Sequence, residues 1–192
     1  MRGVTLRKYL RNKKNLRSQI FFCTFAGQLC ESMKIKLFLT DVDGCLTDGG
    51  MYYSANGDEM KKFCVYDGMG MVLLRQAGIK CGILTSETTD IVVRRANKLK
   101  LDYLRQGVGA HNKLSKLDAA KEICAELHIS LDEVCYVGDD INDVDLLRSV
   151  GLAACPASAL PIVKSLPNIR VLERNGGEGA IRELCDWILE NN

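Results

Sequence analysis

The chain has 192 residues, of which 47% are hydrophobic, 26% are charged and only three are proline. This composition excludes a collagen-like, low-complexity or largely disordered protein, and no apolar run approaches the roughly 18 to 20 residues that span a bilayer. The net charge of +2 is unevenly divided, because residues 1–32 carry seven bases and one acid (7 − 1 = +6), so the remainder carries −4. We therefore expect a poorly ordered basic leader over residues 1–32, one folded domain over residues 33–192, and neither nucleic acid nor membrane as a partner.

Nine cysteines are present, which is an odd number, and they form neither a C-x-x-C pair nor a Cys/His cluster with zinc spacing. Several lie inside apolar runs typical of strands, where a reduced thiol packs as a small hydrophobic group. The cysteines therefore predict a reducing, cytoplasmic location without a structural metal.

Short apolar runs alternate with helical periodicity after Met33. The predicted strands are 34–40, 79–84, 103–104, 134–137, 152–155 and 169–172, and the predicted helices are 68–76, 88–100, 115–127, 142–150, a short one before Pro161, and 178–189. An Asn-Gly pair between residues 51–54 and 59–63 predicts a β-hairpin. The alternation predicts right-handed crossovers and a doubly wound α/β fold with a parallel sheet.

Polar residues follow three of the predicted strands, at the edge where such sheets bind ligands. They are Asp41 and Asp43 after the first strand, Thr85, Ser86 and Glu87 after the second, and Asp139, Asp140 and Asp143 after a later one. A lone aspartate in this place usually caps a helix, but caps do not require two acidic clusters. Because unpaired carboxylates repel one another, the pattern favours a divalent cation.

Two other motifs are excluded. An EF-hand loop starting at Asp41 would need a ligand at Cys45 and a glutamate at Tyr52, and the flanking run is a strand. A phosphate loop over residues 107–115 lacks the glycine before Lys113 and the hydroxyl after it.

The segment 41–48, Asp-Val-Asp-Gly-Cys-Leu-Thr-Asp, resembles the first motif of the haloacid dehalogenase superfamily of phosphatases, and Thr85 with residues 138–143 is similar to its later motifs. Residues 66–70, 106–107 and 176–180 with Arg182 resemble the capless subgroup that acts on 3-deoxy-D-manno-octulosonate 8-phosphate and nine-carbon relatives. The resemblance covers the chain from Met33 onward. It implies a Rossmann-like, Mg²⁺-dependent phosphatase of a sugar-acid phosphate.

The resemblance also implies a role for each polar residue. Asp41 would attack phosphorus and form an aspartyl-phosphate, while Asp43 would act as general acid and base. The metal would be held by Asp41, Asp139 and the backbone carbonyl of Asp43. Thr85 and a lysine would bind the phosphoryl group. Asp140 and Asp143 would orient the lysine or the metal-bound waters.

Two assignments stay open at this point. Lys113 and Lys116 are both candidates for the phosphate-binding lysine, and register favours Lys116. The substrate would be bound by Asp43, Ser86, Glu87, Arg95 and Lys116, with Arg95 facing its carboxylate. Octulosonate phosphatases typically carry arginine where this chain has Glu87, whereas nonulosonate phosphatases carry glutamate. By this resemblance, Glu87 favours a nine-carbon acid over the eight-carbon one. Ser86 replaces a glycine of the family pattern beside the phosphate.

No cap domain fits between the motifs, although phosphoryl transfer benefits from the exclusion of water. The capless subgroup solves this by forming tetramers, with hairpins and C-terminal tails reaching neighbouring subunits, so the resemblance implies a homotetramer. Apolar hairpin residues would otherwise form a costly exposed patch, unless one face of the hairpin packs on its own domain. They are Met51, Tyr52, Tyr53, Met60 and Phe63.

Two rival functions remain. A receiver-like signalling domain accepts phosphate on an aspartate after the third strand. This chain has Arg105 and Gln106 there and no aspartate, which disfavours that function. A catalytically silent oligomerisation module is disfavoured by the intact acids.

Overall fold

The computed structural model describes residues 34–57, 59–109 and 113–192, so the predicted leader lies outside the described residues. Met33–Asn192 forms one compact unit. Among the described residues, no helix combines the length and the apolar character needed to cross a membrane.

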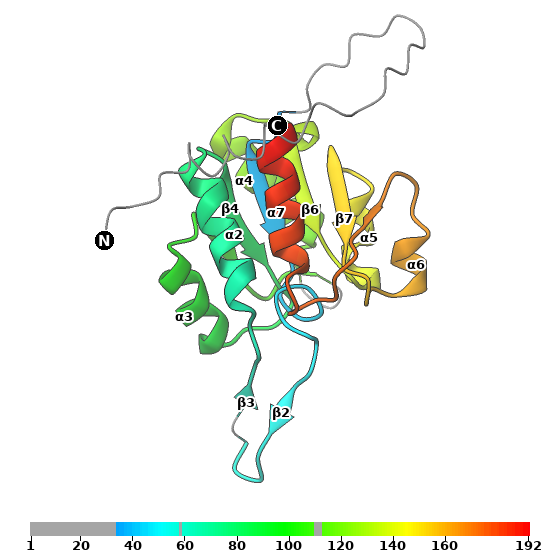
Figure 1. Cartoon of the computed structure of the whole chain (residues 1–192). Coiled ribbons are helices and arrows are strands. Elements are labelled where there is room, and N and C mark those ends of the chain that lie inside the picture. Colours follow the sequence, from blue (N-terminus) through cyan, green and yellow to red (C-terminus); the bar gives the residue numbers. More distant parts are fainter. Residues whose placement is uncertain (1–33, 58, 110–112) are drawn as a thin grey trace, which may run out of the picture. The chain divides into compact units, whose positions relative to one another are not determined.

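Six parallel strands form the central sheet (Figure 1). They are β1 (Leu37–Thr40), β4 (Lys80–Leu84), β5 (Tyr103–Arg105), β6 (Val134–Val137), β7 (Leu152–Cys155) and β8 (Arg170–Val171). Their order is β5-β4-β1-β6-β7-β8, and every pairing between neighbours is parallel. The predicted doubly wound α/β fold is therefore confirmed.

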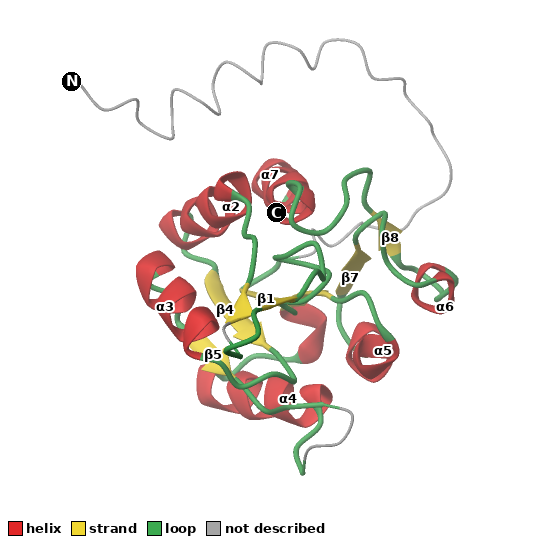
Figure 2. Cartoon of the chain, turned by 90° about the horizontal axis from the view of Figure 1, so that it is seen from below, coloured by secondary structure: helices red, strands yellow, loops and turns green. Residues whose placement is uncertain are grey.

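Helices cover both faces of this sheet (Figure 2). One face carries α2 (Val65–Gln76), α3 (Asp90–Leu99) and α7 (Ala180–Asn191), and the other carries α4 (Lys116–Leu127), α5 (Val144–Leu147) and α6 (Pro161–Lys164). Two 3₁₀ turns, Leu131–Glu133 and Ile141–Asp143, flank β6.

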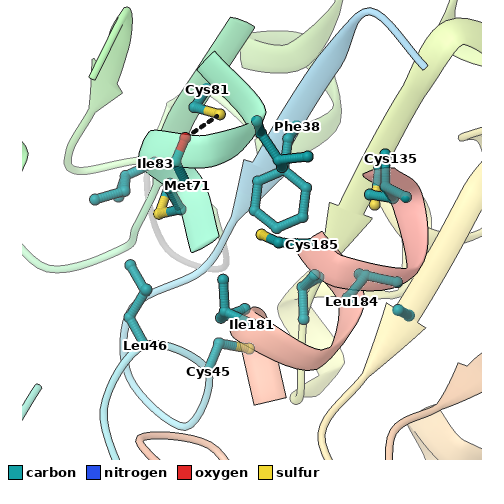
Figure 3. Close-up of a cluster of buried hydrophobic side chains, with 14 of the residues drawn as sticks. Phe38, Cys45, Leu46, Met71, Cys81, Ile83, Cys135, Ile181, Leu184 and Cys185 are labelled. Carbon is teal, nitrogen blue, oxygen red and sulfur yellow. Dashed lines mark hydrogen bonds between the residues drawn. The ribbon is translucent and has the colours of Figure 1, made fainter. Parts of the chain in front are cut away.

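Side chains of the strands alternate between two buried clusters, as the period of two in a strand requires. Phe38 joins the cluster beneath α2 and α7, whereas Leu37 and Leu39 join the one beneath α4. Figure 3 shows Phe38 with Met71 of α2 and Cys185 of α7. The seven cysteines of the described part of the chain are free, and Cys45, Cys81, Cys124, Cys135, Cys155 and Cys185 among them are buried.

Some predicted boundaries differ from the observed ones. The short helix expected before Pro161 instead begins at Pro161, because a helix tolerates proline in its first turn, where the missing N–H has no partner to lose. The helix expected over residues 142–150 is split into a 3₁₀ turn and the four-residue α5.

The predicted hairpin is present but its strands are short. Tyr52–Tyr53 (β2) pairs with Glu59–Met60 (β3) in an antiparallel ribbon that extends from the domain (Figure 1). An isolated bridge between Thr47 and Phe63 lies at its base. We refer to residues 51–61, without the undescribed residue 58, as the hairpin arm.

Candidate active site

Three acid- or hydroxyl-bearing segments meet at the carboxyl ends of β1, β4 and β6. Thr40 at the end of β1 pairs with Ile83 of β4 and Val137 of β6. The Asp41 amide donates to the Val137 carbonyl at 2.9 Å, which fixes the chain where it leaves the strand. Parallel pairing in register therefore brings the residues that follow these strands to one edge of the sheet, as the sequence predicts.

Lys116 is the first residue of α4 and reaches this edge from the side. Its Nζ lies 2.9 Å from Asp41 Oδ2 and 2.7 Å from Asp143 Oδ1, and its side chain is 1% exposed. Burial by itself lowers the pKa of Lys116, but the charges of Asp41 and Asp143 outweigh it and raise the pKa above its ordinary value. Lys113 is exposed, so the lysine favoured by register is the one that contacts Asp41.

Asp143 is fully buried and accepts hydrogen bonds on both carboxylate oxygens. Oδ1 accepts from the Lys116 ammonium at 2.7 Å and from the Tyr136 hydroxyl at 2.5 Å. Oδ2 accepts from the backbone amides of Asp139 at 2.9 Å and Asp140 at 3.1 Å. With both oxygens engaged, Asp143 is built to orient its neighbours.

Asp41, Asp139 and Asp143 each offer a carboxylate oxygen within 4.8 Å of the others. Since Asp143 is saturated by its donors, Asp41 and Asp139 are the carboxylates left to ligate a cation. Burial, together with the charge of Asp143, raises the pKa of Asp41 to about 7 and that of Asp139 to about 6. The three carboxylates thus outnumber the one ammonium of Lys116. The two carboxylates of Asp41 and Asp139 suit Mg²⁺, which takes few protein ligands. The donor set fits the predicted ion.

Two glycines allow the loops around these acids to approach one another. Gly44 has φ +88°, and a Cβ built on it would lie 2.0 Å from Asp139 Oδ2. A Cβ on Gly176 would lie 1.8 Å from the Gly44 carbonyl oxygen. A side chain at either position would displace the loop that carries Asp41 or Asp139.

The Asp43 side chain points to a different partner. Lys61 Nζ lies 2.7 Å from both carboxylate oxygens of Asp43, and Thr47 Oγ1 is 3.3 Å from Oδ1. Among the described acids, Asp43 is not part of the three-carboxylate cluster. Only its backbone carbonyl was expected to ligate the metal, and this remains a prediction.

The loop after β4 supplies the hydroxyl groups. Thr85 is buried, and its Oγ1 accepts from the Glu87 amide at 3.3 Å. Ser86 Oγ donates to the Val108 carbonyl at 3.0 Å and accepts from Asn142 Nδ2 at 2.9 Å, which joins this loop to the one after β6. Glu87 is exposed.

A cavity of about 530 Å³ adjoins this loop. Its lining includes Gly109, Lys116, Asp140, Ile141 and Asn142. A larger depression of about 680 Å³ is lined by Tyr66, Arg174 and Arg182 among others, and neither Lys116 nor a residue of the loop after β6 lines it. We therefore take the smaller cavity, which Lys116 and Asp140 line, as the one beside the chemistry.

Arg95 lies on α3 and is half-buried. Its Nη2 donates to the Cys64 carbonyl at 2.9 Å, and its guanidinium carbon is 5.2 Å from the centre of the Phe63 ring. These contacts join α3 to the start of α2. The expected contact of Arg95 with a substrate carboxylate remains a prediction.

Three residues of this region were not singled out in the sequence. Tyr136 lies in an apolar strand, where nothing indicates that its hydroxyl reaches Asp143. Asn142 was visible only as part of the later motif, and its link to Ser86 depends on the loop conformation. Lys61 is separated from Asp43 by 18 positions and an intervening hairpin.

Comparisons with known proteins agree with this geometry. A sequence model of the haloacid dehalogenase-like hydrolases matches residues 8–155. The chain is 38% identical over 156 residues to 3-deoxy-D-manno-octulosonate 8-phosphate phosphatase KdsC of Yersinia pestis, covering 81% of this chain and 80% of the relative. The Haemophilus influenzae protein of the same name is 35% identical over 156 residues, covering 81% and 83%.

Solved structures show the same likeness. The octulosonate phosphatase of Moraxella catarrhalis, in complex with magnesium, phosphate and KDO, has a TM-score of 0.77 at 34% identity and covers 84% of this chain and 89% of its own. A subfamily III A hydrolase from Legionella pneumophila has a TM-score of 0.78 at 38% identity, covering 83% and 85%.

The chain therefore belongs to the haloacid dehalogenase-like hydrolases. Within that family, the curated relatives named above are octulosonate phosphatases, which confirms the expected resemblance and the expected class of enzyme, a hydrolase of phosphoric monoesters.

Proposed function

We propose that this enzyme hydrolyses the phosphate monoester of a 3-deoxy-2-ulosonic acid with Mg²⁺ as cofactor. The observation that carries the proposal is the buried Lys116, which bridges Asp41 and Asp143 at the strand edge next to Asp139. The identity of 35–38% to octulosonate 8-phosphate phosphatases supports the sugar-acid class.

In this proposal Asp41 is the nucleophile. Its Oδ2 is held by Lys116 and its Oδ1 accepts from the Val42 amide at 2.7 Å, so the carboxylate is oriented before substrate arrives. Attack on phosphorus forms an aspartyl-phosphate on Asp41 and releases the sugar alcohol, and water then hydrolyses that intermediate. Splitting the reaction into two displacements lowers the barrier of each.

Lys116 and Thr85 serve the transferred phosphoryl group. Both are buried, so their charge and dipole act in a medium of low dielectric, where they stabilise developing negative charge more than in water. Asp143 and Tyr136 hold Lys116 in place. Bound through Asp41, Asp139 and the Asp43 carbonyl, Mg²⁺ would neutralise phosphoryl oxygens and carboxylates together.

Asp43 is the proposed general acid and base. Its protonated carboxyl group would give a proton to the leaving alcohol during the first displacement, and the carboxylate that results would accept a proton from water during the second. An alkyl alcohol is a poor leaving group, so this proton transfer matters most for a sugar phosphate.

The length of the sugar acid is the finer part of the proposal, and Glu87 favours a nine-carbon acid such as 2-keto-3-deoxynonulosonate 9-phosphate. Glu87 is exposed beside Thr85 and Ser86, where it is free to accept hydrogen bonds from substrate hydroxyls but repels a carboxylate. The substrate carboxylate would then bind elsewhere, with Arg95 as the proposed partner.

A direct comparison of kcat/KM for the eight- and nine-carbon phosphates tests this assignment. Glu87→Arg should shift the ratio toward the eight-carbon substrate by about ten- to a hundredfold, because one charge-assisted hydrogen bond contributes roughly 1.5 to 3 kcal/mol. Glu122→Arg on the exposed side of α4 is the matched charge control and should leave the ratio unchanged. An unchanged ratio in Glu87→Arg would remove Glu87 from the pocket.

We also propose that the enzyme is a cytoplasmic homotetramer. The hairpin arm exposes a set of large apolar side chains, which is unfavourable in water unless a partner covers it. Their exposed fractions are 37% for Met51, 53% for Tyr52, 64% for Tyr53 and 65% for Met60. Phe63, the remaining predicted member of the patch, packs against the core of its own domain.

A further inference from the structure

Lys61 lies at the base of the hairpin arm with its side chain covered, and no step derived above needs it. Its side chain is 0% exposed, and its Nζ lies 2.7 Å from each oxygen of the Asp43 carboxylate. Contact with both oxygens fixes the position and the rotation of the carboxylate plane, whereas a single hydrogen bond would leave the plane free to turn.

The arm holds the Lys61 ammonium from the opposite side. Glu59 Oε1 of β3 is 3.3 Å from Nζ, and Met51 Sδ, at the other end of the arm, is 3.7 Å from it. Among the described residues, the ion pair with Lys61 is the only polar contact of this buried Glu59 oxygen. Burial by itself lowers the pKa of Lys61, but Asp43 and Glu59 outweigh it and raise the pKa above its ordinary value. The ammonium is therefore shared between the arm and the catalytic loop.

We infer that Lys61 is a positioning residue that orients Asp43 for proton transfer to the leaving alcohol. The inference rests on the proposed function, in which Asp43 is the general acid, and it assigns the orientation of that acid to a residue of the arm. Asp43 has no comparable fixed partner in its own loop, since Thr47 Oγ1 approaches only Oδ1, at 3.3 Å. The orientation of the Asp43 carboxylate thus depends on the position of the arm.

This role has a signature that loss of stability lacks. The ratio kcat/KM reports steps up to the first irreversible one, here the formation of the aspartyl-phosphate. An alkyl alcohol needs a proton in that step, whereas p-nitrophenolate leaves without one. A misdirected acid therefore slows the alkyl ester selectively, while a general structural defect slows both esters.

The experiment measures kcat/KM of Lys61→Met and wild type with two esters. One is the sugar phosphate that wild type prefers, 3-deoxy-D-manno-octulosonate 8-phosphate or 2-keto-3-deoxynonulosonate 9-phosphate, and the other is p-nitrophenyl phosphate. We expect Lys61→Met to lose about ten- to a hundredfold with the sugar phosphate and less than threefold with p-nitrophenyl phosphate. Lys61→Arg, which keeps a charged donor, should return the ratio to within about fivefold of wild type. Glu59→Gln should produce a smaller loss of the same kind.

Lys62→Met is the matched control, because Lys62 is the neighbouring residue and is 55% exposed in a pair with Asp48. It should leave both values unchanged. If Lys61→Met does not fold, Lys61→Gln, which keeps a donor group, takes its place. It should also lose kcat/KM mainly with the sugar phosphate, but by a smaller factor.

Equal losses with both esters, or no loss with either, would overturn the role of Lys61 while leaving the phosphatase intact. A wild-type enzyme that hydrolyses neither ester would instead overturn the proposed function, and the inference with it.

Discussion

Lys116 and Lys61 each place an ammonium group between two carboxylates. The carboxylates that contact Lys116 follow strands of the central sheet, whereas Lys61 belongs to the hairpin arm. These strands are β1 and β6, and the Tyr136 hydroxyl donates to the same Asp143 oxygen as Lys116 does. Lys61 is anchored by Glu59 and Met51 of the hairpin arm, whose two-residue strands pair only with each other.

The difference separates what the domain supplies by itself from what its arm supplies. We call Lys116 with Asp41, Asp139 and Asp143 the Lys116 centre. It orients the nucleophile through buried contacts that persist as long as the sheet is folded. The orientation of Asp43 depends on an arm with exposed apolar side chains, and a two-stranded ribbon alone is only marginally stable. We therefore expect assembly to affect the proton transfer more than the attack on phosphorus.

Breaking the Lys116 centre should have the largest effect. Asp41→Asn removes the proposed nucleophile and Asp139→Asn a proposed metal ligand, and each should lower kcat by about a thousandfold or more, equivalent to roughly 4 kcal/mol in the barrier. Phosphate release is the measurement, and the thermal unfolding midpoint is the control for folding. Activity within tenfold of wild type in either variant would contradict the assignment.

The same centre should make the stability of the metal-free protein depend on pH. The pKa values of Asp41 and Asp139 are raised from 3.8 to about 7 and about 6, so the native state binds their protons more tightly than the unfolded chain. The resulting stabilisation is present at pH 4 and is lost as pH rises through about 6 and then about 7. We expect the free energy of unfolding in EDTA to fall by on the order of several kcal/mol over this range.

Urea titrations at several pH values measure this change, and Mg²⁺ at pH 8 should reverse it because the ion binds only the folded cluster. Asp139→Asn, which removes one titrating group, should show a smaller fall. A stability that rises between pH 5 and pH 8 in Asp41→Asn and wild type alike would show that other groups dominate.

Removing the exposed apolar side chains of the arm should have the smallest effect on the chemistry. Tyr53→Ser with Met60→Ser removes exposed apolar surface, and we expect a lower assembly state in sedimentation, a KM raised by several-fold, and an unchanged unfolding midpoint at low concentration. Val171→Ser in β8 is the matched control, since Val171 is also a strand residue, 46% exposed, at the edge of the sheet. A fully active wild-type monomer at the assay concentration would exclude this role of the arm.

Much of the catalytic edge could be predicted from the sequence, because strand ends in a parallel sheet converge whatever the details of the loops. Asp41, Thr85 and Asp139 were found in this way, and the register of α4 was enough to favour Lys116 over Lys113. Asp143 was expected to orient the lysine; it does contact Lys116, while its role in catalysis stays a prediction.

Contacts set by loop conformation could not be predicted. The pairing of Lys61 with Asp43 depends on the path of the arm, and the link from Asn142 to Ser86 depends on the loop after β6. The helix expected over residues 142–150 begins instead as a 3₁₀ turn, where the Asp143 side chain bonds back to the amides of Asp139 and Asp140. Periodicity alone does not carry that information.

The two ends of the folded domain are joined by a single side chain. Asn192, which follows α7, donates from Nδ2 to the Ile35 carbonyl at 3.1 Å, and its Oδ1 accepts from the Ile35 amide just before β1. Figure 1 shows the hairpin arm at the opposite end of the domain. The domain is thus suited to circular permutation, with a short linker from residue 192 to residue 34 and new termini opened at the Asn56-Gly57 turn. Such a permutant would retain the Lys116 centre within an intact sheet while cutting the covalent continuity of the arm.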